Sequence, residues 1–127
     1  VNNADDVDRA VERQARKLKM GDDERERVRR MVQTTVESES SQRFFRKGDR
    51  ALKEQALIHN GEELRPDRVV FSKRETWVVD FKTGVENDEH RKQVRNYCEA
   101  LRSMGYEKVK GYLLYLREEG AEVVEVM

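Results

Sequence analysis

Hydrophobic positions are distributed unevenly along the chain. The first fifty residues are mostly charged and favour helices, whereas the apolar residues collect between Ala51 and Val126. A short polar helix is predicted from about Asp5 to Leu18, and a second is expected to begin at Asp22-Asp23, where negative charge suits a helix N-terminus. The second helix carries a narrow apolar stripe at helical spacing, made of Val28, Met31, Val32 and Thr35. The N-terminal part is therefore expected to be helical and largely solvated.

From Ala51 onwards the pattern changes to that of strands. The expected strands are Ala51 to Ile58, Leu64 to Ser72 and Thr76 to Lys82. Asn60-Gly61, between the first two, is a strong signal for a two-residue hairpin, and Lys73-Arg74 supplies a second polar turn. These three segments predict an antiparallel three-stranded meander.

An amphipathic helix is expected after the meander, from Asp88 to about Met104. Its apolar stripe consists of Val94, Tyr97, Leu101 and Met104, and Gly105 stands where a left-handed C-cap is needed. Two further strands are expected at Val109 to Leu116 and Ala121 to Val126. The prediction is one α/β domain with a mixed sheet and flanking helices, in which residues 1–50 form a helical N-terminal portion and residues 51–127 the core.

Composition removes several classes of function. The chain has 26 basic and 26 acidic residues, so the basic excess of a protein that binds DNA through phosphate neutralisation alone is missing. One cysteine, Cys98, excludes an internal disulfide and a zinc site built on cysteines, and it fits a reducing cytoplasm, where we expect the protein to act. No apolar run approaches a membrane span, so no membrane partner is expected. The first residue is Val1 rather than Met, from which we expect a fragment of a larger protein.

The two predicted hairpins bring acidic residues together. If both turns contain two residues, Glu54 lies opposite Asp67, and Asp67 lies opposite Asp80. Opposed residues share a face of the sheet, as do residues two apart along a strand, so Lys82 joins the same face. The sequence therefore predicts a row of three carboxylates across three strands with a lysine beside them.

Three neighbouring carboxylates repel one another, which makes sense if a divalent cation neutralises them. Oxygen ligands favour Mg²⁺ or Mn²⁺, and Mg²⁺ often completes its shell with substrate phosphate. The alternative is that these residues have no functional role and are exposed surface charges, with Lys82 in salt bridges to its neighbours. We favour the metal site, because Asp80 and Lys82 end a strand that is apolar on both faces, where an unpaired charge would be costly.

Several motifs, in order, resemble a known family. They are Arg65-Pro66-Asp67-Arg68-Val69-Val70, then Val78-Val79-Asp80-Phe81-Lys82-Thr83-Gly84, then Gln93 and Tyr97, then Gly111-Tyr112-Leu113-Leu114-Tyr115. Over about residues 51 to 126 this set resembles the RecB/AddA-type nuclease domain, found at the C-terminal end of UvrD-like ATP-dependent helicases within the PD-(D/E)xK group. The resemblance implies a restriction-endonuclease-like core and a Mg²⁺-dependent exodeoxyribonuclease that works with a helicase in DNA repair or recombination.

The resemblance also implies roles for individual residues. Asp67 and Asp80 would bind the metal with the backbone carbonyl of Phe81, and Lys82 would be the catalytic lysine. Gln93 and Tyr97 would face the active site or the DNA, although Tyr97 also belongs to the apolar stripe and fits core packing equally well. Of the basic clusters, the one from His90 to Arg95 flanks Gln93, so Arg91 and Lys92 are the better candidates for DNA contact.

The chain departs from the family pattern in one respect. The family usually has a histidine ligand on a helix upstream of the first strand, but no histidine precedes His59 here. Either the helix lies before Val1 in the parent protein, so that this fragment holds an incomplete site and is weak or inactive by itself, or Glu54 substitutes for the histidine. His59 and His90 are expected to be a turn residue and a solvated helix-start residue.

Two functions of different class remain open. The first is the Mg²⁺-dependent nuclease, and the second is a catalytically inactive DNA-binding or scaffolding module of a helicase. Freestanding relatives with an iron–sulfur cluster need several cysteines, so Cys98 alone excludes that cofactor. No nucleotide-binding loop is present in the sequence, so ATP would be used only by helicase domains elsewhere in the parent protein.

Overall fold

The computed structural model describes residues 11–13, 15–16, 19–37, 42–45, 50–53, 56–72, 74–118 and 120–127. It divides into two compact units. One unit comprises Val1–Lys47 with Leu116–Glu122, and the other comprises Gly48–Tyr115 with Val123–Met127. The chemistry predicted from the sequence falls in the second unit.

The described N-terminal residues of the first unit are helical, as the polar N-terminal pattern predicts. Residues 11–13 and 15–16 are helical, while residues 5–10 of the expected first helix lie outside the described residues. Helix α2 spans Asp22–Glu37 and begins where the acidic pair predicts, and it contacts the 3₁₀ helix η1, Gln42–Phe45. The predicted stripe is buried, together with Val36: Val28, Met31, Val32 and Thr35. The sequence prediction for α2 is confirmed.

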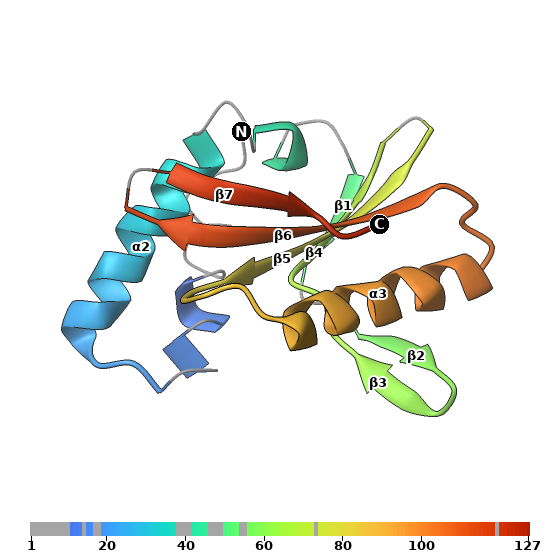
Figure 1. Ribbon diagram of the computed structural model, residues 1–127, viewed down its shortest axis with the longest axis horizontal. Coiled ribbons are helices and arrows are strands. Elements are labelled where there is room, and N and C mark those ends of the chain that lie inside the picture. Colours follow the sequence, from blue (N-terminus) through green and yellow to red (C-terminus); the bar gives the residue numbers. More distant parts are fainter. Residues whose placement is uncertain are drawn as a thin grey trace. The chain divides into compact units, whose positions relative to one another are not determined.

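A mixed five-stranded sheet organises the second unit, which places the chain in the α/β class. Its order is β1-β4-β5-β6-β7, with bounds Arg50–Lys53, Arg68–Phe71, Thr76–Lys82, Val109–Arg117 and Gly120–Glu125. Strand β4 is antiparallel to both β1 and β5, whereas β5 and β6 are parallel. Helix α3, Asp88–Ser103, connects the parallel pair and lies across the sheet (Figure 1).

The continuous three-stranded meander predicted from the sequence is wrong in one respect. The first two expected strands are each broken, and their inner ends form a separate hairpin of β2, Leu57–His59, and β3, Glu62–Leu64. On the second strand the break falls at Arg65, Pro66 and Asp67, because proline has no N–H to donate to a neighbouring strand. The Asn60-Gly61 turn is confirmed, with φ of 52° and 77°.

The strand alignment is the same in the hairpin and in the large sheet, on both sides of the break. Leu57 pairs with Leu64 in the hairpin, and Leu52 pairs with Val69 in the large sheet. Both pairs follow the alignment that a two-residue turn at Asn60-Gly61 requires. The second predicted alignment is confirmed by the pairing of Arg68 with Val79 between β4 and β5.

One hydrophobic cluster holds α3 on the sheet. Its members come from α3, from three strands of the large sheet and from β2: Leu57, Val69, Val78, Val94, Tyr97, Cys98, Leu101, Val109, Leu113 and Tyr115. Gly105 has a positive φ of 105° just after the helix, in agreement with the C-cap prediction. Met104, which the sequence placed in the apolar stripe, is 48% exposed and is the C-cap residue, because the helix ends at Ser103.

No helix among the described residues is long and apolar enough to cross a membrane.

Candidate functional site

The candidate site lies where β5 ends, under the N-terminal half of α3. Asp80 and Lys82 are the fifth and last residues of β5, and Asp67 immediately precedes β4. Since Arg68 pairs with Val79 in antiparallel register, the alignment continues to Asp67 opposite Asp80. Local pairing of two strands thus brings together acidic residues that are 13 positions apart.

The two aspartates are linked by reciprocal hydrogen bonds to the backbone. The Asp67 N–H donates to Asp80 Oδ1 at 3.1 Å, and the Phe81 N–H donates to Asp67 Oδ2 at 2.8 Å. Each carboxylate is therefore held against the backbone of the strand segment that carries the other. Such bonds stabilise the ionised form of a carboxyl group and fix its orientation.

Lys82 is the third member of the cluster. Its Nζ lies 3.0 Å from Asp80 Oδ2 and donates to Gln93 Oε1 at 2.6 Å. Gln93 lies one turn and a half into α3, so the helix supplies the second contact of the ammonium group. Sequence and resemblance named all these side chains, and the structure brings them into one connected group.

Burial makes this group costly for stability alone. Asp80 is fully buried, Asp67 is 6% exposed, and the Lys82 side chain is 12% exposed. The Asp80 carboxylate and the Lys82 ammonium form an ion pair that is largely removed from water. An ion pair taken out of water often contributes little net stability, because desolvation offsets the attraction. Such an arrangement is typical of a site selected for chemistry.

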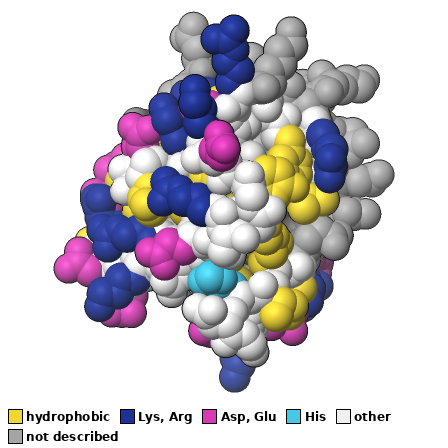
Figure 2. Space-filling model, turned by 90° about the vertical axis from the view of Figure 1, so that its right-hand side faces the viewer, with side chains coloured by type: hydrophobic (Ala, Val, Ile, Leu, Met, Phe, Trp, Pro, Cys, Tyr) yellow, Lys and Arg dark blue, Asp and Glu magenta, His cyan; other side chains and the backbone are white. Residues whose placement is uncertain are grey.

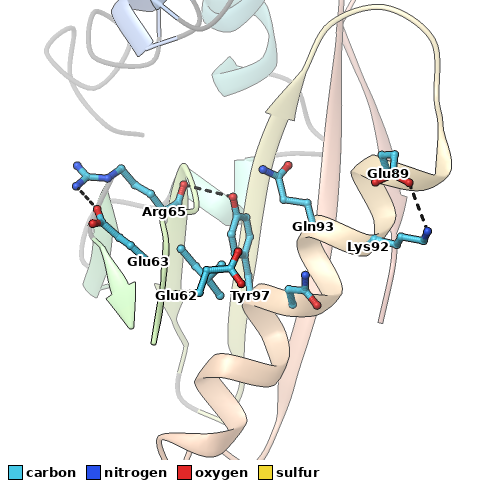
Figure 3. A pocket seen from close by; sticks show the side chains of 9 residues that line it. Glu62, Glu63, Arg65, Glu89, Lys92, Gln93 and Tyr97 are labelled. Atoms are coloured by element: carbon cyan, nitrogen blue, oxygen red, sulfur yellow. Dashed lines mark hydrogen bonds and ion pairs between the residues drawn. The ribbon is translucent and has the colours of Figure 1, made fainter. Parts of the chain in front are cut away.

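Tyr97 has a mixed role. Its side chain belongs to the hydrophobic cluster and is 4% exposed, while its hydroxyl donates to the Arg65 carbonyl at 3.5 Å. Core packing thus accounts for the ring. A pocket of about 360 Å³ opens between β3 and α3 and is lined by both Tyr97 and Gln93. In Figure 3 the Gln93 side chain points towards the strands, away from the Glu89–Lys92 pair.

The proposed DNA contacts lie on the same helix but are engaged with acidic neighbours. Arg91 is 3.2 Å from Glu86, and the exposed Lys92 is 3.4 Å from Glu89. On the face shown in Figure 2, Lys and Arg side chains are interspersed with Asp and Glu. Any attraction of these residues for phosphate is therefore local rather than that of a broad basic face.

The donor set can be compared with the needs of a metal ion. Among the described residues, no group of three His, Cys, Asp or Glu side chains is placed to hold one. Glu54, the predicted third carboxylate, lies outside the described residues. Asp67 and Asp80 nevertheless supply adjacent hard oxygen donors, which fit Mg²⁺ because it needs only one or two carboxylates from the protein. The Phe81 carbonyl stays a predicted ligand.

Sequence reasoning missed the environment of His90. It was expected to be a solvated helix-start residue, but it is half-buried, and its Nδ1 lies 2.9 Å from the hydroxyl of Tyr115. Tyr115 is fully buried on β6, where it pairs with Lys82. The available signal was the pair of helical positions His90 and Gln93, which share a face. His59 ends β2 beside the turn, as predicted.

Comparison with known proteins gives little further information. No family model matches the chain, and no curated protein is similar to it. A crystal structure of SSO0001 resembles this structure with a TM-score of 0.46 and 16% sequence identity, over 99% of this chain and 69% of that one.

Proposed function

We propose that this chain is a metal-dependent DNA nuclease domain of the PD-(D/E)xK type, similar to the RecB/AddA nucleases and with their restriction-endonuclease-like core. The observation that carries the proposal is the connected group of the buried Asp67 and Asp80 with the part-buried Lys82 and Gln93. It combines oxygen donors for a hard cation with one cationic side chain held at a fixed place. That combination suits hydrolysis of a phosphodiester.

Asp67 and Asp80, with the Phe81 carbonyl and Glu54 as further candidates, would hold Mg²⁺ or Mn²⁺. The ion would polarise a phosphoryl oxygen and lower the pKa of the attacking water. Asp67 and Asp80 are held in position by the two backbone N–H groups before any ligand arrives. Such preorganisation removes the need for reorientation during the reaction.

Lys82 would stabilise the negative charge that builds on the phosphoryl group in the transition state, or orient the attacking water. Its ammonium has three N–H donors, of which the contacts with Asp80 and Gln93 use two. The remaining donor gives Lys82 the capacity to interact with a substrate oxygen while both partners hold it in place. Gln93 would then act by orienting Lys82.

The resemblance extends the proposal to the protein's setting. The domain would cut DNA strands delivered by an ATP-dependent helicase, in the same polypeptide or complex, during DNA repair or recombination in the cytoplasm. Arg91, Lys92 and Tyr97 would contact the DNA strand near Gln93. ATP would be used by the helicase domains alone.

One observation favours a second candidate function. The Lys82–Asp80 ion pair balances one buried carboxylate without any cation. A catalytically inactive DNA-binding or scaffolding module of a helicase could keep such a pair for its structure. The two functions differ in whether Lys82 affects turnover.

The deciding experiment is DNA cleavage by the natural full-length protein with Mg²⁺ or Mn²⁺. Lys82→Ala should lower the cleavage rate by about 10²–10³, because a preorganised charge is lost, while metal affinity is retained. Lys108→Ala is the matched control, since Lys108 is exposed next to the opposite end of β5. This variant should cleave DNA at the wild-type rate. A wild-type protein that unwinds DNA but never cuts it would establish the binding module instead.

A further inference from the structure

A histidine in the first turn of α3 connects the helix to the sheet. Asn87 is the N-cap of the helix, and its Oδ1 accepts a hydrogen bond from the His90 N–H at 3.1 Å. The other end of the Asn87 amide, Nδ2, lies 3.2 Å from His90 Nε2. On the other side of the ring, Nδ1 lies 2.9 Å from the Tyr115 hydroxyl.

These contacts determine where the histidine carries its proton. The backbone bond fixes the Asn87 amide with its NH₂ group towards the ring, so Nε2 must accept. The proton of the neutral ring is then on Nδ1, from which it donates to the Tyr115 oxygen. The capping residue therefore sets the tautomer that makes the His90–Tyr115 bond.

The His90–Tyr115 bond lies in the first turn of α3, ahead of the residues that pack in the core. Val94 is the first buried residue of α3, and the apolar contacts continue from there to Leu101. Ahead of Val94, residues Asp88, Glu89 and Lys92 are exposed. The first turn thus lacks buried apolar side chains, and helix ends fray readily. His90 supplies a contact with the sheet where hydrophobic packing does not.

Tyr115, which accepts the hydrogen bond from His90, is next to the candidate site. Tyr115 on β6 pairs with Lys82 on β5 in parallel register, so the two side chains share the face covered by α3. Gln93 follows His90 by three positions on the same face of the helix. Fixing His90 at Tyr115 therefore fixes Gln93 opposite Lys82.

We propose that His90 is a positioning residue. Its hydrogen bond to Tyr115 holds the first turn of α3 on the sheet and so maintains the hydrogen bond between Gln93 and Lys82. This inference rests on the proposed nuclease function for its kinetic consequence, but its structural part does not. One hydrogen bond contributes little to stability beside the burial of the rest of the helix. Losing it should leave α3 docked and disturb only its first turn.

Tyr115→Phe tests the bond with the smallest change, since only the hydroxyl is removed. The readout independent of activity is the NMR signal of the Gln93 side-chain amide, which should be rigid in the wild type and mobile in the variant. In the nuclease assay kcat should fall by up to about 10²-fold with KM unchanged, because Lys82 is misplaced while DNA contacts remain. Tyr112→Phe is the matched control. Tyr112 lies on the same strand as Tyr115, but its hydroxyl donates to Glu125 at 3.5 Å instead of contacting α3.

Two substitutions of His90 distinguish the effect of its hydrogen bond from the effect of its side-chain size. The amide nitrogen of asparagine is as many bonds from Cα as Nδ1, whereas that of glutamine matches Nε2. His90→Asn should therefore restore most of the Gln93 rigidity and kcat, and His90→Gln should not. The inference is overturned if Gln93 stays rigid in Tyr115→Phe, if both His90 variants behave alike, or if Tyr112→Phe causes the same loss. If the wild type cuts no DNA, the nuclease proposal fails, and the Gln93 signal still decides the positioning role.

Discussion

Cys98 shows how one residue responds to its surroundings. Its side chain is fully buried between α3 and the sheet. Burial raises the pKa of the thiol to about 11 from 9.0, partly opposed by the positive charge of Arg102 and reinforced by Glu99. A thiol in this state is not a nucleophile at neutral pH. Cys98 is thus a packing residue, in agreement with the absence of any role for it at the candidate site.

This shift makes stability depend on alkaline pH. Below pH 9 the thiol is protonated in both the folded and unfolded chains, so its contribution is fully present. Between pH 9 and 11 it ionises only when unfolded, which should lower the free energy of unfolding by up to about 2–3 kcal/mol. Urea unfolding of wild type and Cys98→Ala over this range should show their difference shrinking. A constant difference would mean that the buried thiol does not titrate as described.

At the scale of elements, α3 packs tightly against β6 at Gly111. A Cβ added at Gly111 would overlap with Val94 Cγ1 and lie 2.8 Å from Cys98 Sγ. The glycine therefore lets the helix come close enough for its first buried turn to reach the sheet. The same approach brings Gln93 within reach of Lys82.

Gly111→Ala should consequently destabilise the protein by about 1–3 kcal/mol, as is usual for overpacking a filled core. Gly21→Ala is a suitable control, because a Cβ at Gly21 meets nothing within 4 Å. The difference between the two variants in chemical denaturation measures the packing cost. If Gly111→Ala were as stable as the control, α3 could shift freely on the sheet, and the positioning of Gln93 would need another explanation.

Sequence periodicity predicted the elements whose contacts follow a regular repeat. Helices α2 and α3 and strands β5 and β6 lie close to their expected bounds. The breaks around Pro66 were not predicted, because strand alternation continues across them and only tertiary pairing shows where a strand leaves its sheet. Hairpin register placed Asp67 opposite Asp80, but it could not reveal the bond from His90 to a partner 25 residues away.

At the scale of the whole molecule, charge is balanced, while the candidate site gathers two acidic residues in the interior. Equal numbers of basic and acidic residues make the net charge zero. In the second unit, Asp67 and Asp80 are both buried and linked through backbone hydrogen bonds, and Asp80 is paired with the Lys82 ammonium. A divalent cation bound by these two carboxylates would stabilise the folded protein, which a measurement of stability can detect.

Mg²⁺ or Mn²⁺ should therefore raise the melting temperature of the wild-type protein. A ligand that binds only the folded state adds about 2.7 kcal/mol when its free concentration is a hundred times its Kd. Asp67→Asn and Asp80→Asn should each abolish the shift, since a ligand oxygen loses its charge. Lys82→Ala should keep it, because the lysine is not a ligand.

Asp88→Asn is the matched acidic control, as Asp88 is exposed at the start of α3 and should leave the shift unchanged. NaCl at the same ionic strength controls for screening of surface charge, which affects exposed pairs far more than the buried group. Identical melting curves with and without millimolar metal would show that Asp67 and Asp80 hold no cation in this state of the protein. The metal-dependent proposal would then lose its basis, and the Lys82–Asp80 pair would be explained as part of a binding module.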